Sequence, residues 1–273
     1  MRHTRTIALR ELKLGFRNPW AYSFMALFAV FSLALVLIQS KAGLSGYTST
    51  TGTMINLILY LLPLMTLLLG AFSLTAEKEE GGWRLLSSFA LSTRAFICGK
   101  YIGLAGVLIL IVSFGFGLSG MIGAIFGHAF PPSSFGRFLV FSVLLILLFL
   151  GISAILGAIC RNRWQALTYG VAIWFFLVLG WPTLLIAVLG FLPYLWIKPA
   201  LIALIFANPA ELNRLFLIVK MGGGSILGPE YYRWVAWIER PTGSLVFAAV
   251  CVLWILASVG ISIILWERGR RSE

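Results

Sequence analysis

Acidic side chains are scarce in this 273-residue sequence, which contains no aspartate and only nine glutamates. Histidine and cysteine, which commonly bind metals or act in catalysis, are rarer still, with two and three residues. His3 and His128 have no partner close in the sequence, and Cys98, Cys160 and Cys251 follow neither a metal-ligand spacing nor a disulfide framework. The sequence therefore predicts no catalytic residue and no metal site in this chain.

A phosphate-binding loop is missing too. Such a loop needs a glycine, four further residues and then Gly-Lys-Ser/Thr, so that backbone amides and the lysine surround the phosphates. The only Gly-Lys pair, Gly99-Lys100, is followed by Tyr101 and has Arg94 at the position of the first glycine. We expect this chain to bind no nucleotide and no other cofactor.

Apolar residues are abundant, since 60% of the sequence is hydrophobic and only 11% is charged. They form long runs instead of the periodic stripes of a soluble domain or the alternation of a β-barrel strand. Six runs reach the length of about 18 residues that a helix needs to cross a bilayer. We predict an all-α integral membrane protein with a single domain, residues 1–273, and six transmembrane helices: 21–38, 54–76, 101–126, 138–160, 166–189 and 245–266.

The net charge of +12 lies mainly beside these spans. If the N-terminus is cytoplasmic, the cytoplasmic segments hold fourteen Lys and Arg residues and the outer segments hold seven. Basic residues near span ends concentrate on the cytoplasmic side, where they also contact anionic lipid headgroups. The distribution predicts that both termini are cytoplasmic and that the basic residues contact the lipid bilayer, with no nucleic-acid partner.

None of the six predicted spans contains an acidic residue. A carrier driven by protons or sodium usually keeps a carboxylate at membrane depth, where a charge is costly and is retained for function. We therefore expect the energy for any transport to come from another subunit. The alternatives are an ATP-independent secondary transporter or channel, and a structural membrane anchor.

Residues 1–20 predict an amphipathic helix that lies on the inner membrane surface. Its apolar and basic residues fall on separate faces. The apolar face carries Leu9, Leu12 and Phe16, and the basic face carries Arg10, Lys13 and Arg17. Pro19 is expected to end this helix before the first span begins.

The segment 190–244, between spans five and six, is apolar but interrupted by five prolines. A seventh span through 184–207 would carry the C-terminal arginines to the outside, so we predict broken helices in the outer leaflet instead. Asn208, Pro209 and Glu211 have the pattern of an N-cap, N1 and N3 of a short helix that ends at glycines 222–224.

This short helix would have one apolar face, and an aromatic belt would follow it. The apolar face consists of Leu212, Leu215, Phe216 and Val219. Tyr231, Tyr232, Trp234 and Trp237 suit the level of the lipid headgroups.

The third span is rich in glycine, which lets another helix approach closely. Its glycines are Gly103, Gly106, Gly115, Gly117, Gly120, Gly123 and Gly127. They predict either helix packing within the chain or a subunit or gating interface.

The cytoplasmic segment 77–100 combines charge with an apolar surface. Glu77, Glu79 and Glu80 stand at the inner end of the second span, where they need solvent or a basic partner. Trp83, Leu85, Leu86 and Phe89 then offer an apolar face. This combination favours docking to another protein, and an ordinary solvated loop with an interfacial helix is the alternative.

This segment resembles the coupling region of type-2 ABC-transporter permeases, whose second span ends in Glu-x-Glu-x-Gly-Thr, followed by a Leu-rich helix, a Pro-x-Ser-x-Arg-like turn and Gly-Lys. The matching residues are Glu77, Glu79, Gly81, Leu85, Leu86, Ser92, Arg94, Gly99 and Lys100. Gly82 and Ala90 depart from the family's Thr and Pro. Arg10-Glu11-Leu12 and Arg17-Asn18-Pro19-Trp20 are similar to the helix that begins the chain in this family, and the six-span plan is similar too.

The resemblance implies a permease subunit of an ATP-binding-cassette exporter or mechanotransducing complex in a bacterial or archaeal cytoplasmic membrane. Two such chains pair with two copies of a cytoplasmic ABC ATPase, which binds the ATP and Mg. The coupling contacts implied are Glu77, Glu79, Glu80, Gly81, Trp83, Arg84, Leu85, Leu86, Phe89 and Arg94, and those of the N-terminal helix are Arg10, Glu11, Lys13 and Arg17.

Within the family, Asn208-Pro209-Ala210-Glu211 with Arg214 resembles the permeases that serve nitrous-oxide reductase maturation. This finer resemblance implies copper-site assembly outside the cytoplasm. It also implies a periplasmic accessory protein as the partner of Asn208, Pro209, Glu211 and Arg214.

Overall fold

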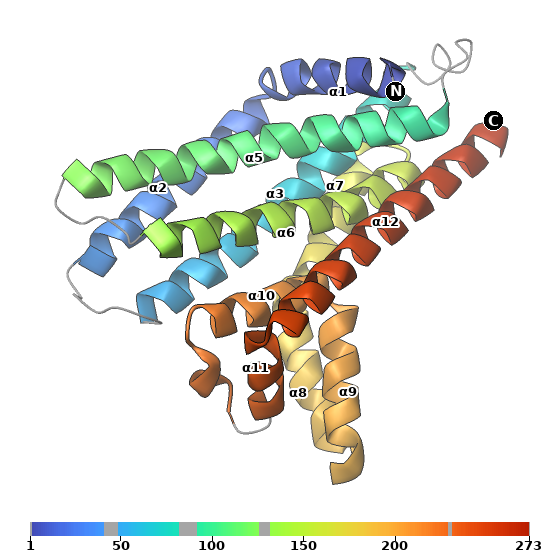
Figure 1. Cartoon of the computed structure of the whole chain (residues 1–273). Coiled ribbons are helices and arrows are strands. Elements are labelled where there is room, and N and C mark those ends of the chain that lie inside the picture. Colours follow the sequence, from blue (N-terminus) through green and yellow to red (C-terminus); the bar gives the residue numbers. More distant parts are fainter. Residues whose placement is uncertain (1, 41–48, 82–91, 126–131, 229–230, 273) are drawn as a thin grey trace.

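The computed structural model describes residues 2–40, 49–81, 92–125, 132–228 and 231–272, and helix is the only regular secondary structure in these ranges (Figure 1). In chain order the elements are α1 (Arg2–Gly15), α2 (Pro19–Ser40), α3 (Ser49–Glu79), α5 (Thr93–Ile125), α6 (Pro132–Ile159), α7 (Arg163–Trp174), η1 (Phe175–Gly180), α8 (Trp181–Phe191), α9 (Tyr194–Ala207), α10 (Pro209–Lys220), η2 (Gly224–Leu227), α11 (Tyr232–Glu239) and α12 (Pro241–Ser272).

The predicted all-α membrane architecture is confirmed. Within the described residues, the helical stretches long and apolar enough to cross a bilayer are Thr51–Glu79, Thr93–Ile125, Ser133–Ile159, Arg163–Phe191 and Pro241–Gly269. α2 is 22 residues long and contains a shorter apolar stretch, Pro19–Ala34. Each of the six predicted spans overlaps one of these helices.

Both chain termini lie at one end of the molecule, beside α1, and the turn between α8 and α9 lies at the opposite end (Figure 1). We call the end of the molecule where α1 lies the α1 end. Contacts join other helices there: the last turns of α3, α6 and α12 and the first turns of α5 and α7. This end gathers the segments that the charge distribution assigns to one side of the membrane.

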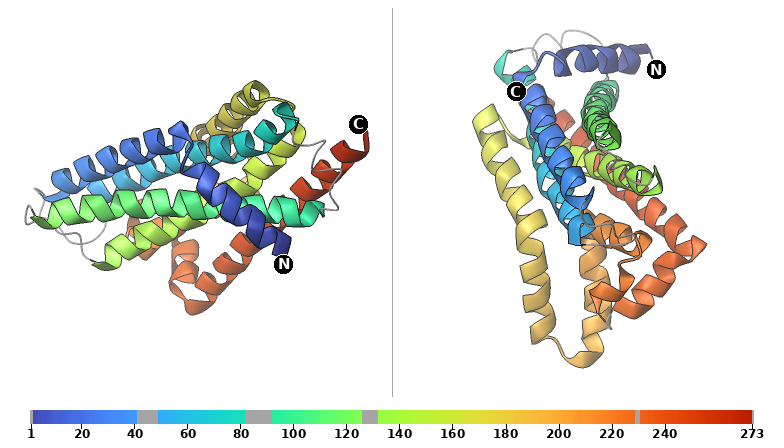
Figure 2. Two further views of the ribbon diagram at one scale, coloured as in Figure 1. Left: turned by 90° about the horizontal axis from the view of Figure 1, so that it is seen from above. Right: turned by 90° about the vertical axis from the view of Figure 1, so that its left-hand side faces the viewer.

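Helix α1 lies across one end of the helix bundle and packs against α5 along one face (Figure 2). A Cβ added at Gly103 would lie 2.6 Å from the carbonyl oxygen of Ala8, and one at Gly99 would lie 2.8 Å from Cβ of Ile7. Ala8 and Glu11 are buried by this contact, whereas Leu9 remains exposed. Part of the α5 glycine stripe therefore serves helix packing within the chain.

Between α2 and α1 the predicted break is present. α1 ends at Gly15, and the side chain of Asn18 accepts a hydrogen bond from the backbone N–H of Trp20 at the start of α2. Pro19 occupies the first helical position, where its missing N–H costs nothing. Leu9 and Leu14 of α1, and Phe16 just after it, are exposed.

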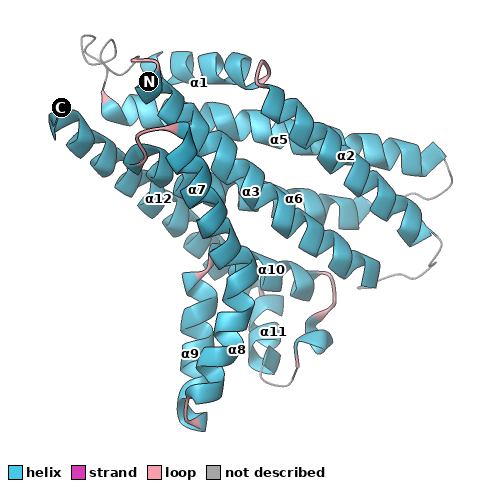
Figure 3. Ribbon diagram, turned by 180° about the vertical axis from the view of Figure 1, so that it is seen from behind, coloured by secondary structure: helices cyan, strands magenta, loops and turns pink. Residues whose placement is uncertain are grey.

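The last part of the fifth span, α8, forms a helical hairpin with α9, and a sharp bend follows (Figure 3). α8 ends at Phe191 and α9 begins at Tyr194, so the stretch 184–207 is not one continuous helix. α9 and α10 then meet at an angle of 105°. The bend lies at Asn208, whose side-chain oxygen accepts hydrogen bonds from the N–H groups of Ala210 and Glu211, which is the predicted N-cap.

Asn208 also contacts the π-helical turn η1. In a π-turn the backbone hydrogen bonds depart from the regular α-helical pattern. The Asn208 amide donates to the carbonyl oxygen of Leu177, in η1, at 2.7 Å. One side chain therefore starts α10 and also satisfies a carbonyl of the fifth span.

Helix α10 is buried over most of its surface, and not only along the one apolar face that the sequence predicts. Leu212, Leu215 and Val219 are buried as predicted, but Ile218 and Asn213 on other faces are buried as well. The Asn213 amide donates to the carbonyl oxygen of Phe141 in α6. Protein therefore surrounds most of this helix.

Both ends of α10 are closed by hydrogen bonds. At its C-terminus Gly222 has φ of +85°, and the N–H groups of Gly222 and Gly223 donate to carbonyls of the last turn. This is the left-handed termination that favours glycine. The guanidinium of Arg137, at the start of α6, donates to the carbonyl oxygen of Lys220 at 2.7 Å.

Replacement of Asn208 tests this anchoring. Asn208→Ala removes the N-cap and leaves the Leu177 carbonyl unpaired, so we expect the free energy of unfolding to fall by roughly 2–4 kcal/mol in total. The measurement is the apparent melting temperature of the detergent-solubilised chain. Asn208→Ser keeps the capping oxygen but is too short to reach Leu177, and should recover about 1 kcal/mol. Equal melting temperatures for wild type and Asn208→Ala would contradict the buried anchor.

Candidate functional site: an ion network at the α1 end

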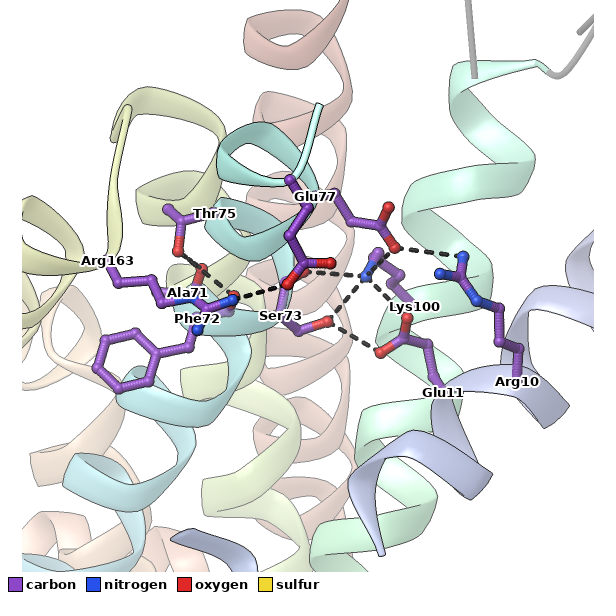
Figure 4. A network of polar contacts seen from close by, with 10 residues as sticks. Arg10, Glu11, Ala71, Phe72, Ser73, Thr75, Glu77, Lys100 and Arg163 are labelled. Atoms are coloured by element: carbon purple, nitrogen blue, oxygen red, sulfur yellow. Dashed lines mark hydrogen bonds and ion pairs between the residues drawn. The ribbon is translucent and has the colours of Figure 1, made fainter. Parts of the chain in front are cut away.

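Lys100 lies at the centre of a buried ion network that joins α1, α3 and α5 (Figure 4). Its ammonium is 2.7 Å from Oε1 of Glu11 and 3.3 Å from Oε1 of Glu77. It also donates to Ser73, at 2.9 Å to Oγ and 3.0 Å to the backbone oxygen. The Ser73 hydroxyl in turn donates to the second carboxylate oxygen of Glu11.

This network is buried and balanced in charge. The side chains of Lys100 and Glu11 are 3% and 4% exposed. Arg10 supplies the second cation, 3.2 Å from Glu77 and half exposed on α1. An ammonium has three protons, and Glu11, Glu77 and Ser73 provide acceptors for all of them. A buried pair of this kind tolerates loss of one partner poorly, because an uncompensated charge then remains in a low-dielectric site.

The neighbouring acids of α3 contact α7. Arg163, at the start of α7, has Nε 3.0 Å from Glu79 and Nη2 2.9 Å from Glu80. Its backbone N–H also donates to Glu79, so this carboxylate lies at the N-terminus of α7, where the helix dipole favours negative charge. Glu80 stays 70% exposed.

Lys78 contacts the remaining helices of this end. Its ammonium donates to the carbonyl oxygens of Ala158 and Cys160, at 2.7 and 2.8 Å, and thereby caps the C-terminus of α6. It also lies 5.0 Å from the centre of the Trp266 ring in α12, and this ring packs against Phe96 of α5. A cation at the last carbonyls of a helix is favourable for the same dipole reason.

Residues 77–80 therefore form a hub, which we call the α3 hub. Successive residues of a helix point about 100° apart, so four charged residues in a row face all sides. In the α3 hub, Glu77 contacts α1 and α5, Lys78 contacts α6 and α12, and Glu79 and Glu80 contact α7. Gly81 follows with φ of +68°, the left-handed conformation that ends α3.

A cavity of about 910 Å³ opens beside the hub, between α1 and the start of α2 on one side and α3 and α7 on the other. Arg10, Glu77 and Arg163 line its polar side, and Trp20 and Phe72 belong to its apolar side. The cavity separates α1 from α7. These two helices are consequently linked to each other mainly through α3.

The structure brings some of the predicted site residues together and leaves others apart. Glu77, Glu79, Glu80, Arg10 and Glu11 are brought together at the hub, and Gly81 adjoins it. Arg94 is exposed on the first turn of α5, and Lys13 and Arg17 are exposed near the end of α1. Trp83, Arg84, Leu85, Leu86 and Phe89 lie outside the described residues.

The outer set lies apart from the hub, at α10. Pro209 and Glu211 are buried, and the Arg214 guanidinium is 2.6 Å from the Glu211 carboxylate on the same helix. Asn208 anchors the helix as described above. These residues build α10, and the contacts described for them are internal to the chain.

The sequence interpretation missed four members of the hub contacts. The sequence marks Lys100 only as part of a Gly-Lys motif, and Arg163 only as one of the fourteen Lys and Arg residues on the cytoplasmic side. The available signal was that both bases stand at cytoplasmic ends of predicted spans, on the same side of the membrane as the three acids that end the second span. Ser73 and the capping role of Lys78 carry no signal in the sequence, because they depend on which helices are neighbours.

The buried and exposed branches of this network predict different costs of mutation. Lys100→Met leaves two carboxylates facing each other in a buried site, and we expect a loss of about 3–5 kcal/mol in stability. Arg163→Ala breaks half-exposed pairs and should cost about 1 kcal/mol or less. Apparent melting temperatures of the two variants in detergent measure the difference.

A second variant guards against a general packing defect. Glu11→Gln combined with Lys100→Met removes one negative charge with the positive one, and should recover part of the loss because Glu77 keeps Arg10. Equal effects of Lys100→Met and Arg163→Ala would show that the Lys100 network is not a buried constraint.

Comparison with known proteins places this sequence in a family. Residues 5–269 match the model of the ABC-2 family transporter proteins. A protein of Stutzerimonas stutzeri described as "Probable ABC transporter permease protein NosY" is 29% identical over 274 residues, covering 97% of this chain and 96% of the relative. A protein of Pseudomonas aeruginosa with the same description is 32% identical over 219 residues, covering 77% and 79%. Since the family match extends over nearly the whole sequence, this multi-pass membrane protein belongs to the ABC-2 family of transporter permeases.

Proposed function

We propose that this chain is the permease subunit that converts ATP hydrolysis by a separate cytoplasmic ABC ATPase into movement of its transmembrane helices. The observation that carries the proposal is the α3 hub, in which residues 77–80 contact α1, α5, α6, α7 and α12. The segment implied to dock on the ATPase, residues 77–100, begins with this hub and includes the start of α5. A displacement of that segment therefore acts on both of its flanking helices.

The ion network makes the two flanking helices move together. Lys100 of α5 contacts Glu77 of α3 and Glu11 of α1 in one buried cluster. Separating these helices would leave charges unpaired away from water, which is costly. The α1 end is therefore suited to receive a push as one body, and α1 serves as a brace across it.

The motion has a route to α10 along two helices. α6 is bound by Lys78 at its last turn, and near its first turn Arg137 donates to the C-terminus of α10. α7 is bound by Glu79 at its first turn, and η1, which continues it, is bound by Asn208 at the N-terminus of α10. The two helices held by the hub thus also hold the two ends of α10. This arrangement supports a mechanical role, with or without passage of a solute.

Orientation, assembly and cofactors follow the same proposal. The hub is the cytoplasmic end, both termini are cytoplasmic, and the membrane is the inner membrane of a bacterium. Two copies of this chain pair with two ATPase subunits, which hold the ATP and Mg. The charge distribution supports the orientation, and the common position of both termini at the α1 end agrees with it (Figure 1).

We further propose that the complex serves copper-site maturation of nitrous-oxide reductase through a periplasmic accessory protein. The similarity to two relatives described as NosY permeases supports this. The Asn208-Pro209-Ala210-Glu211 sequence with Arg214, which resembles these permeases, supports it too. In this role α10 and its neighbours transmit force to the accessory protein.

Co-purification tests the pairing with an ATPase. Tagged wild-type chain, expressed from its own genome with the other subunits, should retain an ABC ATPase after solubilisation. Glu79→Lys combined with Glu80→Lys should lose it by at least about tenfold, because the reversed charges both repel the docking surface and release α7. Quantitative immunoblotting of the eluate measures the ratio of the two subunits.

The control separates docking from internal bracing. Arg163→Glu breaks the same contacts with α7 but keeps both acids, and Glu80 is already largely exposed. Retention of the ATPase by Arg163→Glu indicates that the acids themselves contact the partner. Wild-type chain that purifies without an ATPase, yet moves solute in liposomes under an ion gradient, would instead identify a secondary transporter.

Deletion of the gene in its own host tests the finer role. Nitrous-oxide reductase should then be present as polypeptide but with its copper content reduced several-fold, measured by mass spectrometry of the metal. A second copper enzyme of the same cell, with an independent assembly route, serves as the control. Full copper content in the reductase would exclude this role and leave the general permease proposal unaffected.

A further inference from the structure

A groove between α9 and α11 combines basic and aromatic side chains. Its volume is about 280 Å³. The lining consists of Lys198, Leu201, Ile202 and Phe206 of α9 and Arg233, Trp234 and Trp237 of α11. Small-molecule pockets typically measure roughly 300–1,000 Å³, so the groove accommodates part of an amphiphile and not a large solute.

The polar side of this groove is positive. Lys198 and Arg233 are both exposed, and none of the seven lining residues is acidic. Glu239, at the end of α11, is not part of the lining. The groove therefore presents two cations with no acid among the residues that form it, which favours an anion.

The opposite wall is apolar and aromatic. The Trp234 ring packs at 5.4 Å from Phe206 and at 5.2 Å, edge to face, from Trp237. The indole N–H of Trp234 is buried and has no hydrogen-bond partner among the described residues. A ligand that fits this wall has an apolar part and at least one hydrogen-bond acceptor.

The residues around the groove indicate that this anionic, partly apolar ligand is a lipid. Leu195 and Trp196, on α9 near Lys198, are 86% and 63% exposed, which fits a hydrocarbon environment and not water. Tryptophan and tyrosine concentrate at the headgroup level of membranes, where Lys and Arg also extend toward phosphates. Tyr232, on α11, is exposed as well.

We propose that this groove binds one anionic phospholipid. Its phosphate contacts Lys198 and Arg233, its ester region lies near the indole of Trp234, and the upper part of one acyl chain lies along Ile202, Phe206 and Trp237. The bound lipid fills the space between α9 and α11, the two helices that lie on either side of α10 in the sequence. It thereby stabilises the end of the molecule that is remote from the hub.

Native mass spectrometry of the detergent-solubilised full chain tests this site. The chain is titrated with phosphatidylglycerol or, separately, with phosphatidylcholine of the same acyl chains, and the fraction carrying one lipid is measured. We expect wild type to prefer phosphatidylglycerol. Lys198→Ala combined with Arg233→Ala should reduce its binding at least about tenfold, since each basic residue contributes to attraction of an anionic lipid.

Matched controls separate a built site from general attraction. Lys220→Ala combined with Arg240→Ala removes the same charge from residues outside the groove, and should leave binding unchanged. Ile202→Trp fills the apolar half with both cations intact and should abolish binding, whereas Ala203→Trp, at an exposed neighbouring position, should not.

Four outcomes would overturn the proposal. These are equal binding of the two lipids, equal loss in the control double variant, unchanged binding in Ile202→Trp, and displacement of the lipid by millimolar inorganic phosphate alone. The last result would assign the cations to a free anion.

Discussion

The contact of Lys100 with Glu11 and Glu77 is the constraint on which the α1 end depends. It brings one cation and two anions from three helices together with almost no exposure of Lys100 and Glu11. Such a cluster is stable only if every charge keeps its partner, so α1, α3 and α5 have little freedom to shift against one another. The glycines of α5 complete the constraint, because a side chain at Gly103 would push Glu11 away from Lys100.

This constraint also explains why charges occur within helices of spanning length. Lys100 is in the stretch Thr93–Ile125 and Glu77 is in Thr51–Glu79, both capable of crossing a bilayer by length and composition. Lys100 lies between Glu11 and Glu77, and Arg10 supplies the second cation beside Glu77, so the four charges balance. Paired charges of this kind hold helices together and do not by themselves bind a coupling ion. This agrees with the proposal that another subunit supplies the energy.

The sequence predicted the helical architecture, because length and continuity of apolar runs are local properties. It also predicted the breaks at Pro19 and Asn208, since caps depend on a few adjacent residues. It did not predict which surfaces of α1 and α10 are buried. Lipid tails and protein interior are equally apolar, so the hydrophobicity of a helix face does not reveal which of the two covers it. Ile218 of α10 and Leu9 of α1 illustrate this. The two side chains are similarly apolar, but Ile218 is buried in the protein and Leu9 is exposed.

The candidate site was predictable in part for the same reason. The acids at 77–80 stood out as charges at a span end, but their partners come from residues 10, 11, 100 and 163, far apart in the sequence. The acid pattern alone favoured docking to another protein, whereas in the fold Glu77 and Glu79 already have bases of the same chain beside them. Among these acids only Glu80 keeps most of its side-chain surface exposed. A partner that docks at the hub would therefore contact Glu80, because the other acids are paired with bases that hold the helices together.

The position of α10 connects the hub with the rest of the molecule. α6 and the α7–η1 helix are each fixed at one end by the hub and, through Arg137 and Asn208, to opposite ends of α10. Continuous helices are stiff along their axes, so in the proposed mechanism a displacement at the hub would be passed along them to α10. The exception is η1, where the π-helical turn interrupts the regular hydrogen bonds of the fifth span. If the two routes differ in stiffness in this way, an equal push at the hub moves the Lys220 end of α10 more than the Asn208 end, and α10 tilts instead of sliding.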